Sequence, residues 1–265
     1  HAQEGNVTPA EIAESIPDNL THPYLSFSAD ELPAIRERIA SVPAYRDIMA
    51  RQTAEANRLL YTPVDPLPTE RSGWTAYRRE NTARALTLAF VYQMTGEERY
   101  AAKGYEFADL VCNMPEWHGG SFHSFPIIYD RIWPWNVDDD QVSFGYDILT
   151  GDTAREMAAV YDWLYPGLNT RQRDRIRGAL LENAILRVRG NYGYHWWATA
   201  YRCNWCSVCF SGLGIAAMSL LAGEPELVDV VAASYNGVHG YLGSFGENGG
   251  WPEGCSYWSY GFPQS

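Results

Sequence analysis

The sequence predicts an all-α domain built from helical hairpins, on three observations. Apolar residues recur at steps of three and four over long stretches, the clearest of which runs from Leu227 to Phe245. Short junctions with a Gly followed by an acidic residue separate such stretches at Gly96, Gly151 and Gly223. No comparable stretch alternates with a period of two, as a half-buried strand would. Repeated hairpins indicate a bundle, a solenoid or a closed helical toroid, and their unequal spacing disfavours a regular solenoid.

The first part of the chain is polar and interrupted by Pro, which predicts an N-terminal arm over residues 1–25. A single domain over residues 26–265 follows, because the length suits one large core. Ser28 and Glu31 have the spacing of a capping box before a first amphipathic helix. A second amphipathic helix is predicted over residues 44–60.

Four further helices are predicted from the same periodicity. They cover Thr82–Met94, Glu98–Cys112, Ala154–Leu164 and a stretch of almost five turns that begins at Leu227. Each junction glycine is expected at a left-handed position that ends a helix. The acidic residues after it suit the N-terminus of the next helix. The same hairpin is therefore expected three times.

Residues 113–145 differ from the rest because they are rich in Gly, Pro, His and Trp. An irregular segment of this length inside a compact domain is usually a lid or a binding loop. Its acidic run Asp138–Asp140 suits a calcium site or the Asp-rich motif of terpene cyclases, but a solvated loop end is the favoured interpretation.

Composition limits the classes of partner. The net charge of −12 disfavours nucleic acid and anionic lipid, and no apolar run is long enough to cross a bilayer. All of the 20 basic residues except Lys103 are Arg, which suits bidentate contact with carboxylates. Aromatic residues make up 14%, and many lie in Gly-rich connections, where they suit stacking on sugar rings as well as loop packing. A carbohydrate ligand is therefore favoured.

The five cysteines form no even disulfide set. Cys203, Cys206 and Cys209 have a spacing also found among metal-cluster ligands. On a helix, steps of three place them along one face, so they are expected to be small buried hydrophobes, and no fourth ligand accompanies them. No metal and no cofactor is predicted. The start at His1, without Met, suits either a processed chain or an artificial boundary, and a secreted or periplasmic location is expected.

Two segments carry the residues that suggest chemistry. The first begins at Asn204 and reads Asn-Trp-Cys-Ser-Val; the second, Gly249–Gly261, reads Gly-Gly-Trp-Pro-Glu-Gly-Cys-Ser-Tyr-Trp-Ser-Tyr-Gly. Together they place an amide and two phenols near helix ends. This set suits removal of the proton next to a sugar carboxylate, where donors must stabilise a second negative charge.

These segments resemble the heparinase II/III-like polysaccharide lyases, which include alginate lyases and dermatan sulfate epimerase. The family's Gly-Gly-x-x-Glu-Gly-x-x-Tyr element is matched by residues 249–257, and its Asn motif by residues 204–212. Ala159–Pro166 and the entry segment His22–Ser28 also match, so the resemblance spans most of the chain. It implies an incomplete (α/α) toroid followed by an antiparallel β-sandwich. The sandwich lies outside these residues and is expected as a partner domain of the same protein.

The resemblance also implies roles for individual residues. Tyr257 matches the family's catalytic Tyr, which protonates the leaving oxygen and in some members also removes the proton. Asn204 matches the Asn that neutralises the substrate carboxylate, and the neighbouring Arg202 is a candidate cation. Tyr260 is the fallback for Tyr257, since both could share one helix face with Glu253.

One position departs from the family. Several relatives carry a His directly after the Asn, whereas this chain has Trp205. His195 and His123 are the candidate replacements, although a His among aromatic residues is often structural. The remaining candidate substrate contacts are Trp197, Trp205, Trp251 and Glu253.

The function predicted is a cofactor-independent polysaccharide lyase that cleaves an acidic, uronic-acid-containing polymer by β-elimination. A glycoside hydrolase on a helical toroid is the main alternative and would use two carboxylic acids, drawn from Glu253, Asp130 and Asp162. A uronate epimerase and a non-catalytic sugar-binding protein stay open. The sequence does not specify the polymer, endo or exo attack, or the oligomeric state.

Overall fold

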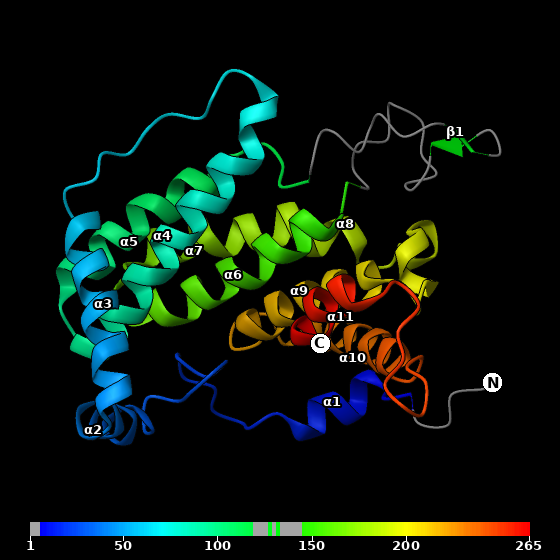
Figure 1. Ribbon diagram of the computed structural model, residues 1–265, viewed down its shortest axis with the longest axis horizontal. Helices are drawn as coiled ribbons and strands as arrows, with labels where there is room; N and C mark the ends of the chain where they lie inside the picture. Colours follow the sequence, from blue (N-terminus) through cyan, green and yellow to red (C-terminus); the bar gives the residue numbers. More distant parts are fainter. Residues whose placement is uncertain (1–5, 119–126, 129–130, 133–144) are drawn as a thin grey trace. The chain divides into compact units, whose positions relative to one another are not determined.

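The computed structural model describes residues 6–118, 127–128, 131–132 and 145–265 (Figure 1). Helices make up 70% of the described residues. The only strands in these ranges are β1 (Ile127–Ile128) and β2 (Arg131–Ile132), which pair antiparallel. The predicted all-α class is therefore confirmed. Over the same ranges, no helix combines the length and the apolar composition that a bilayer crossing needs.

The chain divides into two compact units, each made of separate stretches of sequence. Unit 1 contains residues 1–18, 115–155 and 180–265, and unit 2 contains residues 19–114 and 156–179. Both division points after residue 150 fall within helices, in α6 (Ile148–Leu164) and near the end of α7 (Thr170–Leu180).

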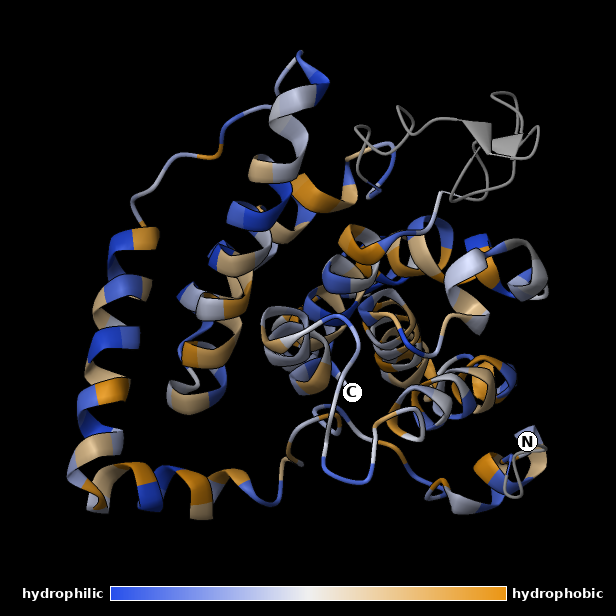
Figure 2. Ribbon diagram, turned by 45° about the vertical axis from the view of Figure 1, so that its right-hand side comes forward, coloured by the Kyte–Doolittle hydropathy of each residue, from blue (hydrophilic) through white to orange (hydrophobic). Residues whose placement is uncertain are grey.

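Unit 2 is built around a hairpin of α4 (Trp74–Thr95) and α5 (Glu98–Cys112), preceded by α2 (Leu32–Ser41) and α3 (Pro43–Leu59). Both α2 and α3 have Pro in the first turn, where the missing N–H costs no hydrogen bond. They carry hydrophilic and hydrophobic residues along their length (Figure 2). The core is formed by apolar residues of α4, α5, α6 and α7, among them Leu88, Ala89, Val91, Phe107, Val111, Val160, Leu164 and Ile176.

Helix α4 begins eight residues before the predicted start at Thr82. Its first two turns bury polar side chains, Arg78 and Asn81, as well as Tyr77. Polar residues on the inward face hide the apolar periodicity on which the prediction depended. By contrast, α5 has the predicted bounds at both ends.

The three predicted hairpin junctions differ in structure. Gly96 ends α4 in the left-handed conformation with φ 73°, as predicted. Gly223 lies in the turn after α9 (Asn204–Leu220) but is not among the described glycines with positive φ. The predicted helix stop at Gly151 is wrong, because α6 begins at Ile148 and continues through it. Gly151 instead allows close packing, since a Cβ there would lie 2.7 Å from the carbonyl oxygen of Val208.

Unit 1 is centred on a hairpin of α9 and α10 (Val228–Leu242). The two helices approach closely at Gly214, where a Cβ would lie 2.8 Å from Cβ of Ser234. The remaining helices are α1 (Pro9–Ser15), a π-helical turn over Leu181–Ile185 that leads into α8 (Leu186–Val188), and α11 (Cys255–Gly261). Short 3-10 turns lie at Tyr192–Tyr194, Trp196–Thr199 and Pro225–Leu227.

In unit 2, Asp162 anchors the entry segment to α6. Its fully buried carboxylate lies 2.7 Å from Nδ1 of His22 and accepts backbone N–H bonds from Tyr24 and Leu25. The imidazole of His22 stacks on Tyr165 with ring centroids 4.0 Å apart. The segments His22–Ser28 and Ala159–Pro166, both noted for the resemblance, are thus in contact. The residues that join them have a structural function.

In unit 1, the N-terminal arm packs on α10. The backbone of Val7 exchanges two hydrogen bonds of 2.8 Å with the side chain of Asn236. A full capping box at Thr8 and Glu11 begins α1, and the sequence analysis missed it. At the predicted box, the Glu31 carboxylate does accept from the backbone N–H of Ser28, but the pair closes a turn before α2 instead of capping it.

Candidate functional site

The two motif segments meet at the N-terminus of α9. Asn204 is the first residue of this helix, and its backbone N–H donates to Oε2 of Glu253 at 2.6 Å. The thiol of Cys203 donates to Oε1 of the same carboxylate at 3.3 Å. We call Cys203, Asn204, Tyr241 and Glu253 the α9 N-terminal cluster.

Electrostatics explain why a carboxylate occupies this position. The N-terminus of a helix has unpaired N–H groups and a partial positive charge, and α9 is 17 residues long. No side chain of its own caps α9, so Glu253 supplies the acceptor from a distant segment. Burial raises the pKa of Cys203 to about 12, and the charge of Glu253 adds to this effect. Cys203 is therefore a neutral donor.

Tyr241 of α10 completes the cluster, and the sequence analysis did not single it out. The residue is fully buried, and its hydroxyl has no hydrogen-bond partner among the described residues. Burial, followed by the charge of Glu253, raises its pKa to about 12, so the phenol keeps its proton. A Cβ on Gly261 would lie 2.7 Å from this hydroxyl and 3.1 Å from Cβ of Asn204. The hydroxyl and Asn204 thus flank the same glycine.

Helix α11 carries the two predicted phenols, but they face different surroundings. Tyr257 is 52% exposed, whereas the hydroxyl of Tyr260 donates to Oδ2 of Asp152 at 2.8 Å. Burial raises the pKa of Tyr260, and the Asp152 charge and hydrogen bond raise it further. The predicted helix face shared with Glu253 is wrong, because α11 begins at Cys255, after Gly254 with φ 82°. Of the two phenols, Tyr257 is the accessible one.

Helix α11 is hydrogen-bonded to α9 through its last residue. The carbonyl of Gly261 accepts from the hydroxyl of Ser207 at 2.8 Å. Asn204 itself is only 2% exposed, and its Oδ1 lies 3.6 Å from Sγ of Cys203. The amide nitrogen is then the part of this side chain that can donate to a ligand.

Two predicted site residues lie in the core of unit 1. Trp197 is fully buried, and its ring N–H donates to the carbonyl of Tyr146 at 3.2 Å, so it is a packing residue and not a surface for stacking a sugar. His195 is 3% exposed, with its ring 5.1 Å from that of Trp197. Burial lowers its pKa to about 4, although a hydrogen bond with the backbone of Arg187 acts in the opposite direction. His195 is therefore neutral near pH 7 and out of solvent reach.

Arg202 directly precedes Cys203 in the sequence, and Trp205 directly follows Asn204. Arg202 is exposed and forms no ion pair with other described residues. Trp205 is half-buried and packs against Trp196, with ring centroids 5.1 Å apart. Both remain candidates for contact with a ligand.

An aromatic cavity of about 280 Å³ is formed by the second motif. Trp251 lines it from one side and packs on Phe245 with ring centroids 4.6 Å apart. Trp258, which the sequence analysis did not select, lines it as well and is 39% exposed. Glycines 249, 250 and 254 form much of the remaining wall, so the rings are accessible. A cavity of this kind suits the face of a sugar ring.

A buried contact between a histidine and a carboxylate lies near the beginning of the long irregular segment. Nε2 of His118 lies 2.6 Å from Oε2 of Glu116, and both side chains are buried. Gly145 packs directly on this imidazole. The other candidates of the segment, His123, Asp130 and Asp138–Asp140, lie outside the described residues.

The prediction for the cysteine run holds only in part, because Cys203 precedes α9 and is partly exposed. Cys206 and Cys209 are fully buried on α9, and burial raises both pKa values, that of Cys206 to about 12. All five thiols are free. In the part of the chain that the structure describes, no three His, Cys, Asp or Glu side chains are grouped to hold a metal ion.

No protein-family model matches the chain, and no curated protein matches it.

Proposed function

We propose that the chain is a polysaccharide lyase that cleaves a uronic-acid-containing polymer by β-elimination. The observation that carries the proposal is the hydrogen bond between Glu253 and the first residue of α9, Asn204. It joins the two segments on which the resemblance to heparinase II/III-like lyases depends, although they are 49 residues apart. A shared site for both segments is what a catalytic assignment requires.

In this proposal, Tyr257 is the acid that protonates the leaving oxygen. It is the exposed phenol of α11, whereas the hydroxyl of Tyr260 is bound to Asp152. The Asn204 amide nitrogen donates to the substrate carboxylate and stabilises the charge that develops when the C5 proton leaves. Arg202 supplies a cation at the edge of the site. Because Asn204 is buried under Gly261, α11 must move when substrate binds.

The aromatic cavity of Trp251 and Trp258 serves as the platform for a neighbouring sugar ring. His195 has no direct role in this proposal, because its ring packs against the core residue Trp197. The finer features that the resemblance implies belong to the same proposal: an incomplete (α/α) toroid, a following β-sandwich that adds groups to the site, and a secreted or periplasmic location.

The hydrolase alternative is less well supported. Asp162 is fully buried and bound to His22 and two backbone N–H groups, so it has the environment of a structural carboxylate. Glu253 is occupied at the start of α9. A glycosidase needs two carboxylic acids facing the scissile bond, whereas Asp162 is buried and Glu253 accepts from Cys203 and Asn204.

The test is an assay for unsaturated product on a panel of uronic acid polysaccharides. It uses this chain and the longest natural polypeptide that contains it, with ultraviolet absorbance and reducing ends measured in parallel. We expect absorbance with one polymer, at least a hundredfold lower in Tyr257→Phe and unchanged in Tyr61→Phe, another exposed phenol. Reducing ends without absorbance would favour the hydrolase, and neither signal with any polymer would overturn the lyase.

A further inference from the structure

A polar cavity of about 630 Å³ is lined by residues of α5, of α7 and of the segments next to them. The lining residues come from two stretches, 105–113 and 169–175, and all of them belong to unit 2. Each lining side chain has a polar group, and each residue is exposed or half-buried. A ligand in this cavity, the α5–α7 cavity, can therefore reach these polar groups.

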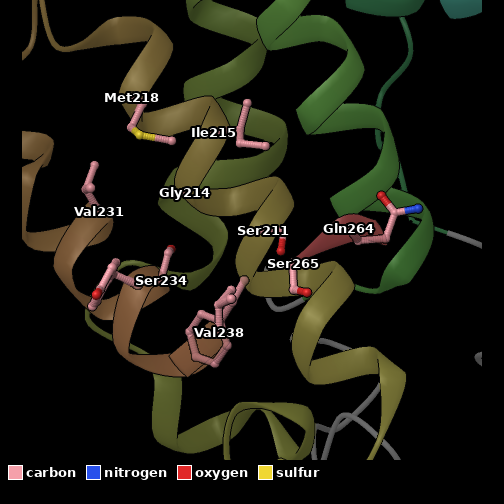
Figure 3. A pocket seen from close by; sticks show the side chains of 11 residues that line it. Ser211, Gly214, Ile215, Met218, Val231, Ser234, Val238, Gln264 and Ser265 are labelled. Atoms are coloured by element: carbon pink, nitrogen blue, oxygen red, sulfur yellow. The ribbon is translucent and has the colours of Figure 1, made fainter. Parts of the chain in front are cut away.

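The cavity between α9 and α10 has a different character (Figure 3). Ile215, Met218 and Val231 make much of its wall apolar. The hydroxyl oxygens of Ser211 and Ser234 are buried and out of reach. A sugar, whose hydroxyls need polar partners, fits such a wall poorly. Of these two cavities, the α5–α7 cavity is the one that suits a polar ligand.

Hydrogen bonds hold one wall of the α5–α7 cavity in place. Arg175 donates from Nε to Oδ1 of Asp109 at 3.2 Å, and from Nη2 to the carbonyl of Cys112 at 3.0 Å and to Oδ1 of Asn113. The amide nitrogen of Asn113 donates to Oδ2 of Asp109 at 3.0 Å. Arg175 thus offsets the charge of Asp109. These bonds use Nε and Nη2, so Nη1 of Arg175 has no partner among the described residues and can donate to a ligand.

The remaining charged residues of the cavity leave one positive charge without a partner. Oδ1 of Asp174 lies 3.4 Å from Nη2 of Arg177, which offsets its charge. Arg171 is exposed, and no ion pair or hydrogen bond joins its guanidinium to another described residue. It precedes Asp174 by three residues and Arg175 by four, so the three side chains lie on one side of α7. The cavity therefore presents the guanidinium of Arg171 to a ligand.

This pattern of charge favours a carboxylate as the ligand group. A guanidinium binds a carboxylate through two parallel N–H groups. A zwitterion suits the cavity less well, because both carboxylates of the wall, Asp109 and Asp174, already have an Arg partner. A neutral ligand would leave the charge of Arg171 without a partner.

The rest of the wall suits the hydroxyls of a sugar ring, which both donate and accept. Burial, followed by the charge of Asp109, raises the pKa of Tyr105, so its hydroxyl keeps its proton and can donate. Asp174 accepts, and the amides of Asn169 and Asn113 offer both kinds of group. A cavity of ~150 Å³ holds benzene, so one of about 630 Å³ has room for one or two sugar rings.

We infer that the α5–α7 cavity is a binding site for a sugar that carries a carboxylate. Arg171 binds the carboxylate, and Tyr105, Asn113 and Asp174 bind the ring hydroxyls. The site shares no residue with the α9 N-terminal cluster or the aromatic cavity. It goes beyond the proposed lyase activity, because binding here requires no cleavage, and each of the two can hold or fail without the other.

NMR of the backbone amides tests this inference with three matched ligands. Protein labelled with nitrogen-15 is titrated with methyl β-D-glucuronide, with methyl β-D-glucoside, which has the same ring without the carboxylate, and with acetate, which has the carboxylate without the ring. None of the three has a 4-linked leaving group, so a lyase does not consume them. We expect saturable shifts at the amides of residues 105–113 and 169–175, with affinity on the order of tenfold tighter for the glucuronide than for the other two.

A pair of variants isolates the contact with the carboxylate. Arg171→Gln should remove the preference for the glucuronide over the glucoside. Arg51→Gln is the matched control, since Arg51 is also an exposed arginine on a helix of unit 2, and it should change nothing.

Four results would overturn the inference. The first is the absence of shifts at these amides, including the case in which shifts occur only around Asn204 and Tyr257, which would leave the proposed function intact. The second is equal affinity for acetate and the glucuronide, which would indicate a site for any carboxylate. The third is equal affinity for the glucoside and the glucuronide, and the fourth is an Arg171→Gln variant that keeps the preference.

Discussion

The carboxylate of Glu253 accepts a hydrogen bond from the backbone N–H of Asn204 at 2.6 Å and so caps a helix that begins 49 residues earlier in the chain. It also accepts from the thiol of Cys203. The second motif, Gly249–Gly261, therefore helps to hold the first motif, which begins at Asn204, in its conformation. A substitution at Glu253 acts on both.

Glu253→Ala should lower the free energy of unfolding by about 1–2 kcal/mol, because it removes the side-chain cap of α9 and leaves the N–H of Asn204 without this acceptor. Glu253→Gln should cost less, since an amide oxygen still accepts. Urea unfolding measures both. The exposed Glu247→Ala is the control, and equal stability of the two Ala variants would contradict the cap.

Gly212→Ala should cost about 3 kcal/mol or more, because its Cβ would overlap the backbone of Gly151, including the carbonyl oxygen. Gly178→Ala on α7 is the matched control. A Cβ there meets nothing within 4 Å, so we expect a gain of about 0.5–1 kcal/mol from the better helix propensity. Thermal unfolding of both variants checks the contrast, and a neutral Gly212→Ala would argue against the close approach.

His195 should make stability fall as the pH is lowered from 6.5 to about 4. Its pKa is about 4 in the folded protein, against an ordinary 6.5, so the unfolded chain binds the extra proton in this window. In His195→Gln, the slope of unfolding free energy against pH should decrease between these values. NMR of the imidazole should show no protonation of His195 above pH 5. A midpoint near 6.5 would contradict its burial.

Tyr260→Phe should lower stability, whereas Tyr257→Phe should lower activity. The first removes a hydrogen bond to Asp152 and should cost about 1–2 kcal/mol of stability, because the carboxylate loses a donor. The second removes an exposed hydroxyl and should leave stability unchanged while it abolishes the proposed lyase activity. Parallel measurement of urea midpoints and product formation separates the two roles. Loss of stability in Tyr257→Phe would show that this phenol is structural.

The sequence predicted helices best where apolar residues alone face inward. Helix α5 and most of α10 were found in this way. Helix α4 was shortened because it buries Arg78 and Asn81, which look like surface residues in a linear pattern. The prediction for Gly151 was wrong, because the sequence does not distinguish a glycine that allows close contact between helices from one that ends a helix.

The candidate site was predicted less completely, because its contacts join distant residues. Nothing in either motif shows that the Glu253 side chain reaches the Asn204 backbone. Tyr241 falls within the apolar periodicity of α10 and has no separate signal in the sequence, and its unpaired hydroxyl is visible only in three dimensions. The burial of Trp197 could not be foreseen either, since an aromatic residue between helices suits stacking on a ligand as well as packing.

The hydrogen bonds between Val7 and Asn236 have a consequence for biosynthesis. They join residues 229 positions apart, so the arm leaves the ribosome long before its partner on α10 exists. At about 5–20 residues per second, that interval is on the order of tens of seconds. During this time α1 is a short isolated helix, marginal in water and open to proteases or to a chaperone. The synthesis of α10 therefore decides when α1 becomes protected.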